Sequence, residues 1–280
     1  MIAESRAATF LRFDLMGALR SRWLLSVAAV DALLFLLFVW LGLRESAILG
    51  FTGVSRVVLN VVNVTLLAIP IVVLVATSQS IVRARTTGLL ELLLSQPTRR
   101  RDWFFGLLSS RAIVLLAPLF LMLALALVFG AVSEGNGAAL GLEVVRAFII
   151  VASLTCAFLG LGLWISAAAP SEEKAILWSL FAWLFASALH DFALIGLLLR
   201  TSLPPQTVFF LAALNPVEAA RVALLANVDA QLSILGPVGF WIANKLGAGL
   251  AFAIGAVWPV LLGGFFTWRA LRRLERRDLV

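Results

Sequence analysis

The feature that most constrains this 280-residue sequence is a set of apolar runs, each about 20 residues long. An α-helix rises about 1.5 Å per residue, so a run of this length crosses the roughly 30 Å hydrocarbon core of a bilayer. Only 13% of the residues are charged, about half the share found in a typical soluble domain. A membrane barrel would instead show shorter segments that alternate apolar and polar residues. The predicted fold class is therefore all-α, a polytopic membrane helix bundle.

Six segments fit this length, and the whole of 1–280 is predicted to form one transmembrane domain. The predicted spans are residues 23–43, 57–82, 112–132, 147–169, 175–199 and 246–268. Outside them we expect an interfacial helix at 1–22, a cytoplasmic loop at 83–103, an extracytoplasmic helical loop at 200–245 and a basic cytoplasmic tail at 269–280.

The orientation of the spans follows from the basic residues, most of which fall on one side of the membrane. Positive charge close to span ends is retained in the cytoplasm, so both termini are predicted to be cytoplasmic, in the cell inner membrane. Tryptophans at the predicted span ends fit rings anchored at headgroup level: Trp23, Trp40, Trp103, Trp241 and Trp268. Because the basic residues flank span ends instead of forming one soluble face, the net charge of +7 does not indicate nucleic acid as a partner.

Several enzyme classes lack the residues they need. No GxxxxGK phosphate loop surrounds Lys174 or Lys245, so we expect no ATPase site in this chain. With one His and one Cys in the sequence, we expect no metal cage and no bound cofactor. Glu172 and Glu173 resemble the glutamate pair of prenyl-processing intramembrane proteases, but such sites also need several histidines, and this sequence holds only His190.

The loop 83–103 is the most informative connection. Gly88 breaks the preceding helix, residues 89–94 are leucines apart from one glutamate, and Pro97 followed by arginines at 99–101 ends the run. The predicted helix is too short to cross a membrane and too apolar for water, so it should pack against lipid or protein. Two interpretations remain open here: a helix that docks another protein, and a helix held on the inner leaflet by the arginines and anionic lipid.

Two other loops carry helix-capping signals. Ser171 followed by Glu172 and Glu173 suits the start of a helix. In the outer loop, Asn215 and Pro216 predict a cap and a first helical turn. We expect apolar outer helices that cover the bundle. An extracytoplasmic accessory protein stays open as a partner, although no residue points to one.

Some ionisable or amide side chains lie inside predicted spans, where exposure to lipid is costly. They are Asp31, Asn60, Asn63, His190 and Asp191. They should face the bundle interior, either lining a path for substrate or protons, or forming hydrogen bonds between helices. In the last span, Gly247, Ala251 and Gly255 recur every four residues and predict close helix packing, within the chain or across a dimer.

The loop 83–103 also resembles a known family. Its residues Gly88-Leu89-Leu90-Glu91, Leu93-Leu94-Ser95, Pro97 and Arg99 are similar to the G-T-L-E-x-L-L-x-x-P-x-x-R pattern of ABC-2 type transporter permeases. Arg83 and Arg85 stand where that family usually carries acidic residues. Further similarity extends over most of the chain and looks most like the NosY-type subgroup, which serves nitrous oxide reductase maturation. It is carried by Ser21-Arg22-Trp23-Leu24-Leu25, Gly50-Phe51-Thr52, Glu173-Lys174, and Leu214-Asn215-Pro216 with Arg221.

The resemblance implies a six-span permease that works as a homodimer with two separate ATPase subunits, which bind ATP and Mg. It also implies that the short helix couples those subunits to the spans. The implied coupling residues are Gly88, Leu89, Leu90, Glu91, Leu93, Leu94, Pro97 and Arg99. The scarcity of sulfur and imidazole argues against naked copper as cargo, so a sulfur-containing or lipid-like cargo fits the apolar path better. The alternatives are a drug or lipid exporter of the same superfamily and an ATP-independent membrane scaffold or assembly factor.

Overall fold

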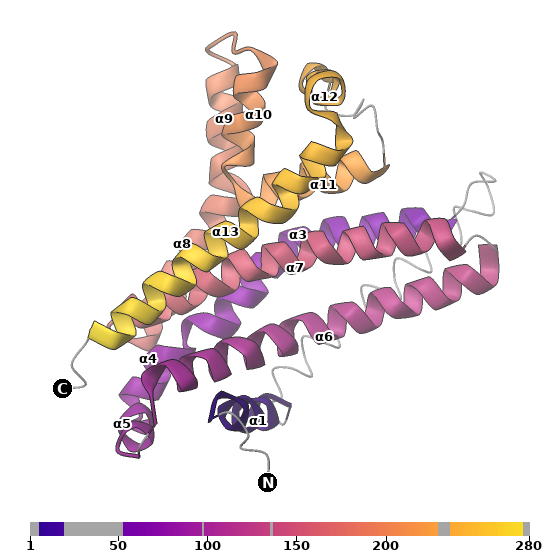
Figure 1. Cartoon of the computed structure of the whole chain (residues 1–280). Helices are drawn as coiled ribbons and strands as arrows, with labels where there is room; N and C mark the ends of the chain where they lie inside the picture. The colour runs from indigo at the N-terminus through magenta and orange to yellow at the C-terminus, as the bar shows by residue number, and fades with distance from the viewer. Residues whose placement is uncertain (1–5, 20–52, 97, 135–136, 229–235, 277–280) are drawn as a thin grey trace.

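The computed structural model of the chain describes residues 6–19, 53–96, 98–134, 137–228 and 236–276. These residues form helices and turns, without a β-strand among them, which confirms the predicted all-α membrane fold (Figure 1). The helices are α1 (Arg6–Leu19), α3 (Gly53–Ser78), α4 (Ser80–Thr86), α5 (Leu89–Leu94), α6 (Arg100–Glu134), α7 (Gly137–Ala168), α8 (Glu172–Leu184), α9 (His190–Leu198), α10 (Pro205–Ala213), α11 (Pro216–Val228), α12 (Gly236–Trp241) and α13 (Gly247–Arg276). Two π-helical segments, Phe185–Leu189 and Ile242–Leu246, join α8 to α9 and α12 to α13.

Five stretches of the described chain are long and apolar enough to cross a membrane. They are Thr65–Thr86, Arg100–Leu125, Gly141–Ala168, Glu172–Leu198 and Gly236–Arg276. Each overlaps one of the predicted spans, whereas the first predicted span, 23–43, lies outside the described residues. A sixth candidate is the pair Pro205–Ala213 and Pro216–Ala226, which falls in the loop 200–245 and bends by 118°.

The bend in that pair lies at Asn215, one of the few polar residues that are buried. Its Oδ1 accepts a hydrogen bond from the Val217 N–H at 3.0 Å, which confirms the predicted cap of α11. Its Nδ2 donates to the Ala186 carbonyl at 2.6 Å, in the π-helical segment between α8 and α9. One side chain therefore fixes both the start of α11 and the junction of α8 with α9.

Helix α7 is the centre of the bundle and packs against α3, α6, α11 and α13. Glycines allow its closest contact, with α13, because a Cβ on Gly160 would overlap the Gly263 carbonyl and a Cβ on Gly263 would overlap the Cys156 carbonyl. One turn or two away, Ser153 Oγ donates to the Gly255 carbonyl at 3.2 Å. Such close approach of small residues is how membrane helices gain packing contacts without a hydrophobic driving force.

The stripe of small residues predicted for packing runs along α13 on the side that meets α11. Ala251 and Gly255 are buried, and a Cβ on Gly255 would overlap the Ala219 carbonyl of α11. Gly247 instead precedes the regular helix with φ of 77° and has open space where a Cβ would stand. Its backbone conformation is one that side-chain-bearing residues rarely adopt, so this glycine serves the start of α13.

Candidate functional site

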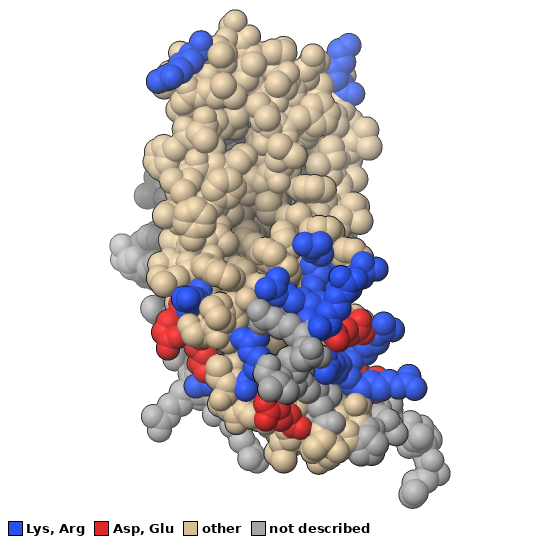
Figure 2. All heavy atoms as spheres, turned by 90° about the vertical axis from the view of Figure 1, so that its left-hand side faces the viewer, with Lys and Arg blue, Asp and Glu red and all other residues tan. Residues whose placement is uncertain are grey.

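The segment predicted to couple an ATPase forms a corner between α3 and α6, built from α4, α5 and the first turn of α6 (Figure 1). The last turns of α13 lie at the same end of the bundle, which we call the basic end. Figure 2 shows Lys and Arg gathered on the lower part of this face, whereas the surface above is uncharged apart from basic side chains at its upper corners.

Gly88 turns the chain from α4 into α5 with φ of 71°, the left-handed conformation that glycine adopts without strain. The predicted helix break and short helix are therefore both present. Within α5, Leu90 is 1% exposed and belongs to the main buried cluster, whereas Leu92 is 64% exposed and Leu89 is 37% exposed. Leu93 is half-buried against that cluster. The face of α5 that looks outward is thus formed by Leu89 and Leu92.

The remaining residues of the motif are either exposed or lie partly outside the described structure. Glu91 and Arg99 are exposed. The backbone of Leu94 ends α5, but its side chain and the whole of Pro97 lie outside the described part of the structure. Thr98 closes the corner, because its Oγ1 donates to the Leu93 carbonyl at 2.7 Å.

Helix α4 is bonded to the end of α7 and the start of α8. Ser166 Oγ of α7 accepts from the backbone N–H groups of Ile81 at 2.9 Å and Val82 at 3.1 Å, using both lone pairs of the hydroxyl. Arg85 Nη2 donates to the Ala169 carbonyl at 2.6 Å. Arg83 and Glu172 approach to 3.8 Å in a surface ion pair. The two arginines that replace acidic residues of the family pattern therefore attach the corner to the α7–α8 turn.

The first turn of α6 is bonded to the end of α13. Arg100 Nη1 donates to the carbonyls of Leu274 at 2.9 Å and Glu275 at 3.1 Å, in the last described turn of α13. Arg101 forms an ion pair with the Glu275 carboxylate. The two helices that flank α5 in sequence, α4 and α6, are therefore bonded directly to the ends of α7 and α13 and to the start of α8.

Helix α1 lies along α6 and flanks the same corner. Asp14 accepts a hydrogen bond from Ser110 Oγ at 2.6 Å and pairs with Arg111 at 3.5 Å. A cavity of about 230 Å³ opens between α1, α4, α5 and α6, with Phe13 and Leu89 among its apolar lining residues. The corner thus offers both a projecting leucine, Leu92, and an adjacent hollow.

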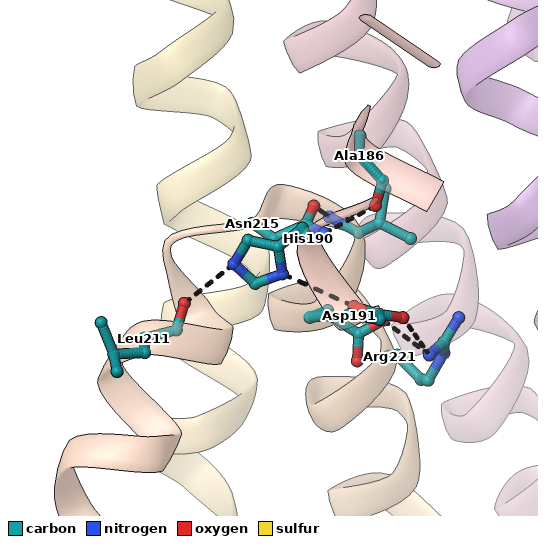
Figure 3. A network of polar contacts seen from close by, with 8 residues as sticks. Ala186, His190, Asp191, Leu211, Asn215 and Arg221 are labelled. Atoms are coloured by element: carbon teal, nitrogen blue, oxygen red, sulfur yellow. Dashed lines mark hydrogen bonds and ion pairs between the residues drawn. The ribbon is translucent and has the colours of Figure 1, made fainter. Parts of the chain in front are cut away.

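A second group of polar residues lies at the other end of the bundle (Figure 3). His190 Nε2 donates to the Leu211 carbonyl at 3.2 Å, and His190 Nδ1 lies 3.5 Å from the Asp191 carboxylate. Arg221 lies 2.6 Å from Glu218 and 3.9 Å from Asp191. These contacts join α9, α10 and α11, so the predicted pair His190 and Asp191 meets charged partners from the outer loop.

Sequence reasoning missed those partners, because Glu218 and Arg221 lie outside the predicted spans. Their spacing of three residues on one helix, behind the Asn-Pro start of α11, was the available signal. Of the other polar candidates, Asp31 lies outside the described residues, and the structure describes only the backbone of Asn60 and Asn63, within α3. Among the described residues, no group of three or more His, Cys, Asp or Glu side chains is placed to hold a metal ion.

The sequence is similar to known proteins over almost its full length. A family model for ABC-2 family transporter proteins matches residues 9–279. A probable ABC transporter permease protein NosY from Pseudomonas aeruginosa is 30% identical over 260 residues, which cover 88% of this chain and 94% of the relative. A protein of the same description from Stutzerimonas stutzeri is 26% identical over 255 residues, which cover 90% of each.

Proposed function

The chain belongs to the ABC-2 family of transporter proteins, and we propose on that basis that it is a permease driven by separate ATPase subunits that dock on α5. The match of residues 9–279 to the family supports the transporter role. The observation that carries the docking site is the pair of exposed leucines, Leu89 and Leu92, on a six-residue helix that is itself bonded firmly to the spans.

Docking at α5 provides a route for the energy of ATP. The partner subunits bind ATP and Mg, and their closure displaces α5 as a rigid element. Because Ser166 and Arg85 join α4 to α7, and Arg100 joins α6 to α13, that displacement rotates the central helix pair of the bundle. A leucine that projects from a rigid base suits this role, since buried apolar anchors dominate the affinity of protein interfaces. In this proposal the chain lies in the cell inner membrane, and its basic end faces the cytoplasm.

Two copies of the chain form the path in this proposal. Support comes from α8 and α9, which are apolar around most of their circumference and touch their own chain along one side only. Exposed large side chains of α8, α9 and the π-helical segment between them include Leu177, Phe181, Phe185 and Phe192. A second copy related by two-fold symmetry would bury the same surface on both chains. An extracytoplasmic accessory protein at the α9–α12 end is compatible with the arrangement, and surrounding lipid covers what remains.

Because the chain is similar to two NosY permeases, the first role to test is that of the NosY-type subgroup, transport that serves nitrous oxide reductase maturation. We propose a sulfur-containing or lipid-like cargo, because an apolar bundle with one Cys and one His offers few ligands for copper. A drug or lipid exporter is the competing assignment within the family, and an ATP-independent scaffold is the competing class outside transport.

Co-purification tests the docking role. The tagged chain is recovered from its native membrane with Leu92→Asp, and with Ser202→Asp as the matched control, which adds the same charge on an exposed polar residue beyond α9, far from α5. We expect an ATPase subunit with the unchanged chain and the control, and a loss of about tenfold or more with Leu92→Asp, as for a central interface residue. An ATPase absent from all three preparations would favour the scaffold, and equal recovery in all three would remove α5 as the docking site.

A further inference from the structure

Four arginines share one face of the last turns of α13 at spacings of three and four residues, which align side chains on a helix. They are Arg269, Arg272, Arg273 and Arg276. All four are exposed, whereas Ala270 and Leu274 on the other side of the helix are buried in the main core. Together with Trp164 of α7, these arginines line a cavity of about 410 Å³ between the two helices. Figure 2 shows the basic gathering on this face directly below the uncharged surface.

Arg272 interacts electrostatically with the Glu275 carboxylate, whose ion pair is with Arg101, and no described ion pair joins Arg269, Arg273 or Arg276 to a carboxylate. Ion pairs described at the basic end use Arg83, Arg101 and Arg111 instead. Arg272 lies over the Trp268 ring at 4.0 Å, a stacking that leaves the in-plane N–H groups of the guanidinium free to donate. Like charges four residues apart on a helix repel, so an anion in the cavity would stabilise this end of α13.

The position of the cavity along α13 identifies the kind of anion. Trp268 directly precedes the first of these arginines and ends the predicted span 246–268, a position where tryptophan rings settle among headgroups. Trp164 stacks against Phe266 with ring centroids 5.5 Å apart and gives the cavity an apolar wall. A basic hollow between spanning helices, with one apolar wall, matches a phospholipid, whose phosphate is charged and whose glycerol and acyl chains are not.

We propose that the cavity between α7 and α13 binds the phosphate of an anionic phospholipid, in the leaflet that faces the basic end. The guanidinium groups donate paired hydrogen bonds to the phosphate oxygens, and the lipid holds the ends of α7 and α13 together. This site is distinct from α5 and does not depend on whether an ATPase docks there.

The test measures lipid binding to the purified full chain by native mass spectrometry. The delipidated chain is titrated with phosphatidylglycerol and, separately, with phosphatidylcholine of the same acyl chains. The cavity variant is Arg273→Gln with Arg276→Gln. The matched control is Lys174→Gln with Arg200→Gln, which removes the same charge from exposed basic residues outside the cavity. We expect a preference for phosphatidylglycerol that falls about 30-fold in the cavity variant, roughly fivefold for each arginine, and stays unchanged in the control.

Four results would overturn the proposal. The first is equal binding of both lipids to the unchanged chain, a readout that holds even if the cavity variant fails to fold. The second is a control variant that loses as much affinity for phosphatidylglycerol as the cavity variant, which would indicate a general attraction of the lipid to positive charge. The third is displacement of phosphatidylglycerol by millimolar inorganic phosphate, which would indicate a site for a soluble anion. The fourth is a cavity variant that keeps its full preference for phosphatidylglycerol, which would indicate that the lipid binds elsewhere on the chain.

Discussion

Helices α7 and α8 are consecutive apolar helices joined by a short turn, yet they have different surroundings. In the stretch Gly141–Ala168, which holds most of α7, 67% of the most apolar window is buried within the chain, against 6% in Glu172–Leu198, which holds α8 and α9. Both stretches are apolar enough to span a membrane, because lipid and a protein interior are equally apolar surroundings. The difference lies in small residues: glycines mark α7 and its partner α13, and large side chains cover α8 and α9.

The comparison implies that α7 and α13 form the stable frame of each chain, and that α8 and α9 form the surface offered to the membrane or to a second copy. The corner at α5 is bonded to the frame through Ser166 and Arg100. It is also bonded to the start of α8 through Arg83. Motion at α5 can therefore change how the frame and the offered surface are arranged.

The largest effect is expected at the α7–α13 contact. Gly263→Ala places a methyl group against the backbone of Cys156 and Ala157, which cannot move aside as a flexible side chain could. We expect a loss of about 1 to 3 kcal/mol in the free energy of unfolding, typical of overpacking. Gly264→Ala is the matched control, because open space surrounds that position and alanine favours the helix. Thermal unfolding of both variants in detergent should shift in opposite directions. Equal shifts would mean that the two helices are not packed through their backbones.

Single cysteines in place of exposed leucines should change the stability of the chain less, and they report where two copies meet. In a Cys156→Ala background, Leu177→Cys on α8 should form disulfide-linked dimers in the membrane, since residues near a two-fold axis meet their own copies. Leu261→Cys on the exposed face of α13 is the matched control and should stay monomeric. Non-reducing gels of oxidised membranes give the readout. Dimers from position 261 and none from 177 would mean that lipid covers α8 and that copies meet elsewhere.

Much of the fold could be predicted because spanning helices must satisfy their backbone internally and must match the thickness of the bilayer. Gly88 and the Asn215-Pro216 start of α11 were also predictable, since each imposes a local backbone geometry. The exposed side of α5 was not. Leu90 and Leu92 look alike in a run of leucines, and only tertiary packing, which brings Leu90 into the main buried cluster, decides which one is buried.

Charged pairs between distant segments could not be predicted from the sequence either. The contact of Asp191 with Arg221 depends on the 118° bend between α10 and α11, a tertiary feature that no local pattern specifies. The arginines of α13 show the opposite case. Their spacing was visible in the sequence, but the cavity they line needs Trp164 from a helix about 100 residues earlier in the chain.

The central claim is that α5 is where an ATPase meets this permease, and site-specific cross-linking tests it most directly. A photoactivatable thiol reagent is attached to Leu92→Cys in the Cys156→Ala background, and to Leu199→Cys, an exposed leucine at the far end of α9, as the control. After illumination of native membranes, the attached proteins are identified by mass spectrometry. We predict an ATPase subunit with a phosphate-binding loop at position 92 and none at position 199. Capture of the ATPase equally from both positions, or of lipid and a second copy alone from position 92, would contradict the account.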